Sequence, residues 1–273
     1  MLSGGDLLRN SNNSMTIDFC RINESWLAQH GLTAEALSST IGALVEENLQ
    51  GETACTIQQV TGVLLFFKTY RLRRGRDKLR TLLGRSEAQR AYNNAFRLQK
   101  RGITCPEAVA LVGVRRALMV LVNEALTDGE ILLGCFCRLL RHQVPSPPLT
   151  ALFEQLADFL LQLHTAGIYH SDLHDTNIWV KQHDDKFTFK LVDLEAVRLQ
   201  PLIVSHQRQK NLLRLCRNLG TAAEIVGLDG KPLALEFANY YFKAAHWTVT
   251  EQSLELVEDA AVRGMERWRE LHP

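Results

Sequence analysis

The sequence predicts an α+β fold in which a small β-rich half precedes a larger helical half. Two observations lead to this class: short β-rich runs separated by turn residues lie before residue 123, and apolar residues at helical spacing dominate after it. At 273 residues, with 46% hydrophobic and 22% charged residues, the chain has an ordinary globular composition. We expect a disordered polar tail over residues 1–14, then lobes over 15–122 and 123–273. Met15 is an alternative start.

Three runs in the first lobe predict a β-meander. They are ALVEENL (43–49), ACTIQQV (54–60) and VLLFFKTY (63–70), and turn residues such as Thr61-Gly62 separate them. A charged stretch then predicts a long helix over 77–101, which Gly102 closes because glycine favours the position after a helix end. The apolar run ALMVLV (117–122) predicts a further strand.

Helices dominate the second lobe. One apolar stripe at helical spacing predicts a buried helix over 149–167, and its members are Leu149, Leu152, Phe153, Leu156, Phe159, Leu160 and Leu163. Further helical patterns lie near 203–219, 231–245 and 250–270. Thr248 and Glu251 have capping-box spacing for the last of these.

A polar stretch between these helices predicts a hairpin with an unusual end. Residues 178–182 and 186–192 are strand-like, and residues 183–185 form the turn between them. Because antiparallel strands return the chain to its starting point, Asn177 should lie beside Asp193. Asp172 precedes Asn177 on the loop that enters the hairpin. Carboxylate and amide oxygens gathered in this way suit Mg²⁺ together with substrate phosphates.

This pattern resembles the catalytic loop of the protein-kinase-like bilobal fold. The quoted residues are His170, Asp172 and Asn177 in HSDLHDTN, followed by the hairpin and Asp193. The resemblance implies that Asp172 orients and deprotonates an acceptor hydroxyl, that Asn177 and Asp193 hold the metal, and that His170 braces the loop. His174 would lie near the γ-phosphate, where protein kinases keep a lysine.

Two other segments fit the same resemblance, and two features depart from it. Lys68 closes the third predicted strand, where the fold keeps the lysine that binds the α- and β-phosphates, and Glu124 would lie near the adenine. No GxGxxG motif joins the first two predicted strands, where only Gly51 is available. The expected glutamate partner of Lys68 is replaced by Ala91, so Glu87, one turn earlier, is the nearest substitute.

The layout as a whole is similar to the lipopolysaccharide kinase (Kdo/WaaP) family. The segments that carry this similarity are KTYR, LQKRGITCP, LVNEAL, LHTAGIYHSDLHDTNI, LVDLEAVRL and RQKNLLRLCRNL. The resemblance implies an ATP- and Mg²⁺-dependent kinase that phosphorylates a heptose or Kdo hydroxyl of the lipopolysaccharide inner core. Two alternatives stay open: a kinase-like scaffold (pseudokinase) without turnover, and an aminoglycoside- or choline-type phosphotransferase.

Charge indicates an anionic partner other than nucleic acid. The formal net charge of +1 gives no electrostatic argument for nucleic-acid binding. Residues 68–85 nevertheless hold eight basic residues and one acidic residue. This run is either a solvated loop or a contact with phosphorylated glycolipid or the anionic membrane surface. Six scattered cysteines without a CxxC pair favour a cytoplasmic protein, with peripheral attachment to the inner face of the cytoplasmic membrane as an open alternative.

Overall fold

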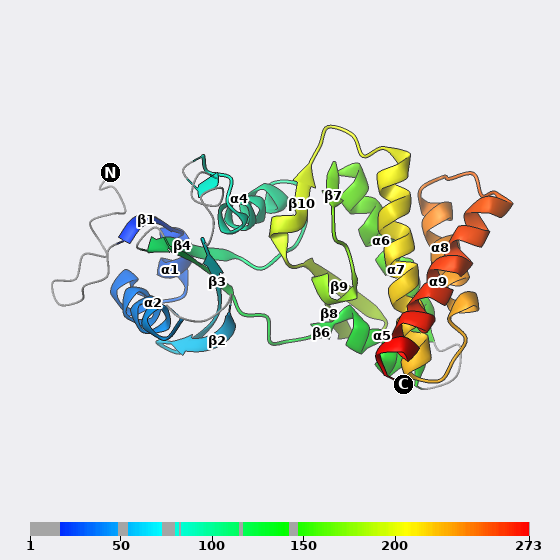
Figure 1. Cartoon of the computed structure of the whole chain (residues 1–273), viewed down its shortest axis with the longest axis horizontal. Coiled ribbons are helices and arrows are strands. Elements are labelled where there is room, and N and C mark those ends of the chain that lie inside the picture. Colours follow the sequence, from blue (N-terminus) through cyan, green and yellow to red (C-terminus); the bar gives the residue numbers. More distant parts are fainter. Residues whose placement is uncertain are drawn as a thin grey trace. The chain divides into compact units, whose positions relative to one another are not determined.

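The computed structural model describes residues 17–48, 54–72, 80–81, 83–114, 117–141 and 147–272. The chain divides into two compact units, Met1–Lys100 with Cys105–Leu126 and Arg101–Thr104 with Thr127–Pro273. The first is built around a β-sheet and the second mainly from helices (Figure 1), which confirms the predicted fold class. The expected tail, Gly51 and the basic residues 73–79 lie outside the described residues.

Unit 1 contains a five-stranded antiparallel sheet of order β1-β4-β5-β3-β2. Its strands are β1 (Ile17–Ile22), β2 (Cys55–Val60), β3 (Val63–Arg71), β4 (Ala108–Val114) and β5 (Leu118–Glu124). The predicted strands over 54–60, 63–70 and 117–122 are confirmed. Patterns for β1 and β4 were not recognised in the sequence, because β4 is buried along its whole length and therefore shows no alternation of apolar and polar residues.

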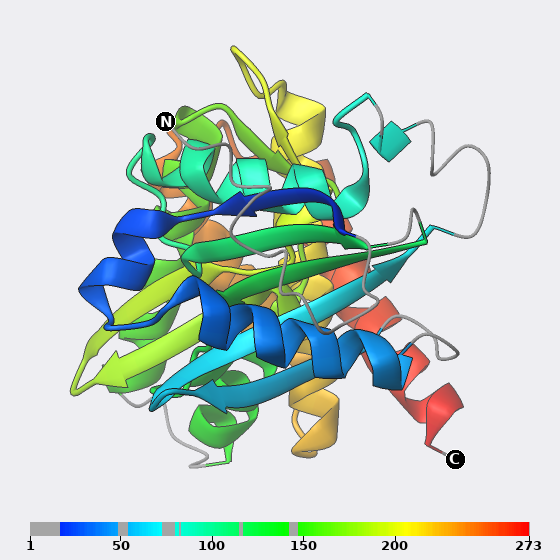
Figure 2. The ribbon, with the colours of Figure 1, turned by 90° about the vertical axis from the view of Figure 1, so that its left-hand side faces the viewer.

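The strand predicted over 43–49 is wrong, because residues 43–48 belong to a helix, and Leu49 lies outside the described residues. Unit 1 has helices α1 (Glu24–Gln29), α2 (Ala34–Asn48) and α4 (Glu87–Gln99). Leu37, Ile41 and Leu44 are buried at helical spacing and pack in one core with Phe67 and Val122 of the sheet. Figure 2 shows α2 lying across the strands. The helical spacing of these buried residues therefore decides the structure, although the individual residues of the segment also favour strands.

Helix α4 begins later than predicted. Its first residue is Glu87, after a capping box between Ser86 and Gln89, whereas the charged pattern predicts one helix from residue 77. Residues 80–81 are helical and 83–86 are not, and residues 77–79 and 82 lie outside the described residues. Its end is as expected, since Gly102 has a left-handed φ of 73° shortly after the last helical residue. The Ser86 hydroxyl lies 3.2 Å from the Met119 sulfur, which fixes the helix start on one face of the sheet.

Unit 2 combines helices with short strands. Its helices are α5 (Leu132–Leu140), α6 (Pro147–Thr165), α7 (Ser205–Ile225), α8 (Gly230–Ala244) and α9 (Glu251–Leu271), with short 3₁₀ helices η1 (Asp175–Asn177) and η2 (Leu194–Ala196). Its strands are β6 (Glu130–Ile131), β7 (Ile168–His170), β8 (Ile178–His183), β9 (Lys186–Leu191) and β10 (Val197–Leu199). All four predicted helices of this half are confirmed. The predicted capping box is wrong, because Thr250 and Ser253 form it instead.

Two glycines let α7 and α9 approach closely. A β-carbon on Gly264 of α9 would collide with the Arg217 carbonyl of α7, and one on Gly220 of α7 would collide with the Ala261 carbonyl. The Thr221 hydroxyl also donates to the Gly264 carbonyl at 3.1 Å. These backbone contacts hold the residues of both helices in a fixed register.

Candidate active site

The β8–β9 hairpin brings the two ends of the predicted site together. The strands pair from Ile178 with Leu191 to His183 with Lys186, and Asp184 and Asp185 form the two-residue turn. The Val192 N–H donates to the Asn177 carbonyl at 3.0 Å. The predicted hairpin is therefore confirmed, and Asn177 lies across from the residue that precedes Asp193.

Asp193 occupies a strained backbone position that His170 supports. Its φ of 55° and ψ of 55° are left-handed, which is uncommon for a residue other than glycine and is concentrated at functional sites. His170, which is 1% exposed, donates from Nε2 to the Asp193 carbonyl at 3.3 Å. Burial lowers the pKa of His170, although the Asp193 contact acts in the opposite direction. A neutral His170 thus joins the loop to the Asp193 segment.

The carboxylate of Asp172 is accessible and lies between the side chains of His174 and Arg214. Its side chain is 61% exposed; Oδ2 lies 3.4 Å from His174 Nε2 and Oδ1 lies 3.8 Å from an Arg214 nitrogen. The Asn177 side-chain amide donates to the Asp172 carbonyl at 2.9 Å, which fixes the loop backbone. The carboxylate is therefore positioned but open to an incoming substrate.

His174 links three members of the loop. Its Nδ1 lies 2.7 Å from the Thr176 hydroxyl and its Nε2 lies 3.2 Å from the Asn177 amide nitrogen. A proton on Nε2 makes His174 a donor to the Asp172 carboxylate, whereas an unprotonated Nε2 accepts from the Asn177 amide, so only one of these two bonds forms at a time. In either case His174 lies in contact with the Asp172 side chain.

A buried hydrogen-bond chain anchors this loop to three helices. The Asn211 amide of α7 donates to the His170 carbonyl at 2.8 Å, and its oxygen faces His164 Nε2 of α6 at 3.3 Å. His164 Nδ1 in turn lies 2.7 Å from the Tyr241 hydroxyl of α8. Because the Asn211 oxygen can only accept, Nε2 of His164 donates to it. Burial lowers the pKa of His164 to about 4, and in the neutral ring Nδ1 accepts from the Tyr241 hydroxyl.

Sequence reasoning missed Asn211, Arg214 and Tyr241. Arg214 donates to the Ser171 carbonyl and Asn211 to the adjacent His170 carbonyl. Asn211 and Arg214 stand one turn apart on α7 in the quoted run RQKNLLRL, so the helical spacing of polar residues in an apolar pattern could have indicated them. Tyr241 gave no comparable signal.

The candidate nucleotide residues lie in unit 1. Lys68 is half-buried on β3, with its Nζ 5.2 Å from the centre of the Tyr70 ring. Lys68 and Tyr70 are two residues apart on β3, so their side chains lie on the same face of the sheet. Tyr70 pairs with Met119, which Ser86 contacts at the start of α4, so Lys68 lies on the face of the sheet that α4 contacts. The Glu124 carboxylate accepts the Glu107 N–H at 3.2 Å at the end of β5.

The structure does not join Glu87 to Lys68. Glu87 is exposed in the first turn of α4, whereas Ala91 is 3% exposed on the buried side. Within the described residues the Glu87 carboxylate has no ion pair with Lys68. Glu87 nevertheless starts the helix that contacts the Lys68 face of the sheet.

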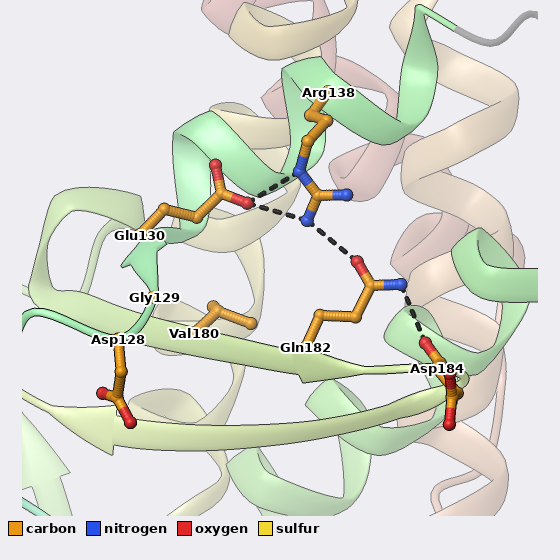
Figure 3. Close-up of a pocket in the computed structure, with 7 residues that line it drawn as sticks. All are labelled: Asp128, Gly129, Glu130, Arg138, Val180, Gln182 and Asp184. Atoms are coloured by element: carbon orange, nitrogen blue, oxygen red, sulfur yellow. Dashed lines mark hydrogen bonds and ion pairs between the residues drawn. The ribbon is translucent and has the colours of Figure 1, made fainter.

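A polar cavity of about 430 Å³ is lined by residues of β6, α5 and β8 and of the turns beside them. Figure 3 shows Arg138 directed between Glu130 and Gln182, with nitrogen–oxygen distances of 2.8 and 2.9 Å. The Gln182 amide donates onward to the Asp184 carbonyl at 2.8 Å. Because these groups satisfy one another, we assign the cavity no part in the site.

The oxygen ligands present fit a divalent cation. The Asn177 amide nitrogen is turned to the Asp172 carbonyl, so its oxygen points the other way, and Asp193 follows on the neighbouring strand. One carboxylate and one amide oxygen suit Mg²⁺ only if substrate phosphates complete its shell. The described residues contain no cluster of three or more His, Cys, Asp or Glu side chains that could hold a metal ion by themselves.

The fold and this loop define a kinase-like protein, and comparison with solved structures supports the fold. WaaP in complex with acyl carrier protein is similar with a TM-score of 0.56 and 22% identity, over 93% of this chain and 100% of that chain. The RIO-type serine/threonine-protein kinase Rio1 of Haloferax volcanii is 27% identical over 156 residues, which are 57% of this chain and 47% of the relative. The chain thus spans about half the length of that curated relative.

Comparison of the sequence with models of protein families assigns the family of this chain. The model of the lipopolysaccharide kinase (Kdo/WaaP) family matches residues 36–236, more than half of the chain, so this chain belongs to that family. Membership of a kinase family supports phosphotransferase activity and implies the use of ATP. None of the helices within the described ranges is long and apolar enough to cross a membrane.

Proposed function

We propose that this protein transfers the γ-phosphate of ATP to a sugar hydroxyl of the lipopolysaccharide inner core, on heptose or Kdo. The observation that carries the proposal is the end of the β8–β9 hairpin, where Asp172, Asn177 and Asp193 are gathered by a loop that His170 and Asn211 anchor. Family membership supports the phosphoryl donor and the substrate class.

Asp172 is the proposed base. As the bond between the γ-phosphorus and its bridging oxygen breaks, the acceptor oxygen forms the new bond to phosphorus and its proton passes to the Asp172 carboxylate, with ADP leaving. The 61% exposure of the side chain leaves room for the acceptor. His174 orients the carboxylate and His170 holds the loop against the Asp193 segment.

Asn177 and Asp193 would hold Mg²⁺, which would neutralise charge on the transferred phosphate when bound. The hairpin fixes both residues before nucleotide arrives, because their strands are joined by backbone hydrogen bonds. Such prior positioning reduces the entropy lost on reaching the transition state.

Lys68 would hold the α- and β-phosphates, with Glu124 near the adenine. Glu87 remains the proposed partner of Lys68, since it starts the helix on the same face of the sheet. A second candidate function is a kinase-like scaffold without turnover. It is favoured by Ala91, because this residue occupies the buried side of α4, where the glutamate partner of Lys68 is expected.

We further propose that the protein acts at the inner face of the cytoplasmic membrane, where the basic run over 68–85 would meet phosphorylated glycolipid. The test of function is ADP release from ATP and Mg²⁺ with a panel of lipopolysaccharide core fragments, with the product identified by mass. Addition of one phosphate to a heptose- or Kdo-containing fragment supports the proposal. Absence of transfer to every fragment, with ATP bound, would favour the scaffold.

A further inference from the structure

Helix α7 carries a row of positive charges that starts at the catalytic loop. Lys210, Arg214 and Arg217 follow one another at intervals of one turn, so they share one face of the helix. Like charges at this spacing repel and destabilise a helix. A bound anion would remove that repulsion.

Arg214 is the member that touches the loop. It donates to the Ser171 carbonyl, and its second terminal nitrogen lies 3.8 Å from Asp172 Oδ1. Its side chain is 22% exposed, so the guanidinium is largely enclosed beside the proposed base. Any anion bound to the exposed part of this row lies next to the acceptor position.

Arg267 of α9 extends the row on the neighbouring helix. Gly264 packs against the Arg217 carbonyl, and Arg267 follows Gly264 by one turn of α9. Burial lowers the pKa of Arg217, and the positive charges of Arg267 and Arg214 lower it further, while Asp172 and Asp175 act against this. Arg217 and Arg267 are thus close enough to repel each other.

Within this cluster Asp172 pairs with Arg214, but the described residues give Arg217 and Arg267 no carboxylate partner. The other arginines of α9 have partners: Arg263 lies 3.8 Å from Asp259, and Arg269 lies 2.6 Å from Glu224. Across the described ranges, no carboxylate oxygen lies within ion-pair distance of Arg217 or Arg267.

We propose that Arg214, Arg217 and Arg267 form an anion subsite for the acceptor, which binds a phosphate or carboxylate group that the acceptor sugar carries near its reacting hydroxyl. The proposal rests on the proposed function and adds the chemical class of acceptor that this surface selects. Guanidinium groups suit either anion because their paired N–H donors match two oxygens of a phosphate or carboxylate.

The test compares how the full-length protein phosphorylates charged and neutral acceptors. Steady-state phosphorylation is measured with a neutral heptose, a heptose phosphate and Kdo, for the parent and for Arg217→Gln/Arg267→Gln. The double variant should raise KM for the charged acceptors about tenfold relative to the neutral one, since charge-assisted hydrogen bonds are lost. The charged acceptor with the larger increase identifies whether the subsite prefers phosphate or carboxylate. Arg263→Gln/Arg269→Gln on the same helix is the matched control.

A second measurement is independent of turnover. Inorganic phosphate is titrated into the full chain with a saturating non-hydrolysable ATP analogue, and binding is followed by ³¹P line width. Weaker phosphate binding in the Arg217→Gln/Arg267→Gln variant than in the parent and the control supports the subsite even if no acceptor reacts. Equal binding in all three proteins, or an equal rise in KM for neutral and charged acceptors, would overturn it.

Discussion

At the scale of single residues, the site depends on side chains whose positions are fixed by neighbours rather than by their own preferences. Asp193 keeps a left-handed backbone that costs energy of order 1–3 kcal/mol for such residues, and His170 supports it through the carbonyl. Asn177 uses its amide nitrogen on the loop, which leaves its oxygen for a cation. Each of these roles can be tested by a substitution that preserves shape.

Asp193→Asn should weaken nucleotide binding more with Mg²⁺ than without it. The substitution removes one hard anionic ligand but keeps the size of the side chain. The measurement is an ATP titration of parent and variant in the presence and absence of Mg²⁺. Asp185→Asn, in the exposed hairpin turn, is the control. Equal losses under both conditions would remove Asp193 from the metal site.

His164 should make stability depend on pH. Its pKa in the folded state is about 4, below the ordinary value of 6.5, so the unfolded chain binds the extra proton first. The free energy of unfolding should therefore be fully retained above pH 6.5 and fall as the pH decreases towards 4, by about 3 kcal/mol for this group.

Urea denaturation between pH 4 and 7 measures this effect. His164→Gln should show a shallower dependence than the parent, although buried His170 contributes in the same direction in both proteins. An unchanged slope in the variant would mean that His164 is not held neutral by the chain from Tyr241 to Asn211.

At the scale of elements, helices position the loop that carries Asp172, and the β8–β9 hairpin positions the proposed metal ligands Asn177 and Asp193. Helices α6, α7 and α8 supply His164, Asn211 and Tyr241 to one hydrogen-bond chain, and α9 closes on α7 through glycine. In unit 1, α4 brings Glu87 to the Lys68 face of the sheet without an ion pair between them. Two predictions concern these contacts.

Gly264→Ala should destabilise the protein by about 1–3 kcal/mol, as overpacking of a tight contact usually does. The added β-carbon would meet the Arg217 carbonyl, which is backbone and cannot rotate away. Chemical denaturation compares it with Glu255→Ala, an exposed position on the same helix where alanine adds no contact. A loss no larger than that of the control would show that α9 can shift away from α7.

Glu87→Ala should lower turnover at least tenfold, because Glu87 is the proposed partner that would orient Lys68 against the phosphates when nucleotide is bound. Ala91→Glu in the same chain should restore much of the rate, since it places a carboxylate one turn further along α4. Steady-state rates at saturating acceptor measure both variants. If Glu87→Ala is silent while Lys68→Ala abolishes activity, another group orients the lysine.

At the scale of the whole molecule, the division into a β-rich and a helical half, the four long C-terminal helices and the hairpin could be predicted from the sequence, because periodicity and turn residues act locally. Helix α2 was missed, since the seven residues 43–49, of mixed apolar character, fit a strand until Leu37 and Ile41 are counted into the same helical stripe. The anchoring chain from Tyr241 to His170 joins residues far apart in sequence, and only tertiary packing brings them together.

The central claim is that Asp172 accepts the acceptor proton in an ATP-dependent transfer to a sugar. The most direct measurement compares the parent and Asp172→Ala for phosphate transfer to lipopolysaccharide core fragments, with Mg-ATP affinity measured in parallel. We expect transfer by the parent, a loss of about a hundredfold or more in the variant, and nearly unchanged nucleotide affinity, because the base contacts the acceptor. Comparable turnover by parent and variant would contradict the account.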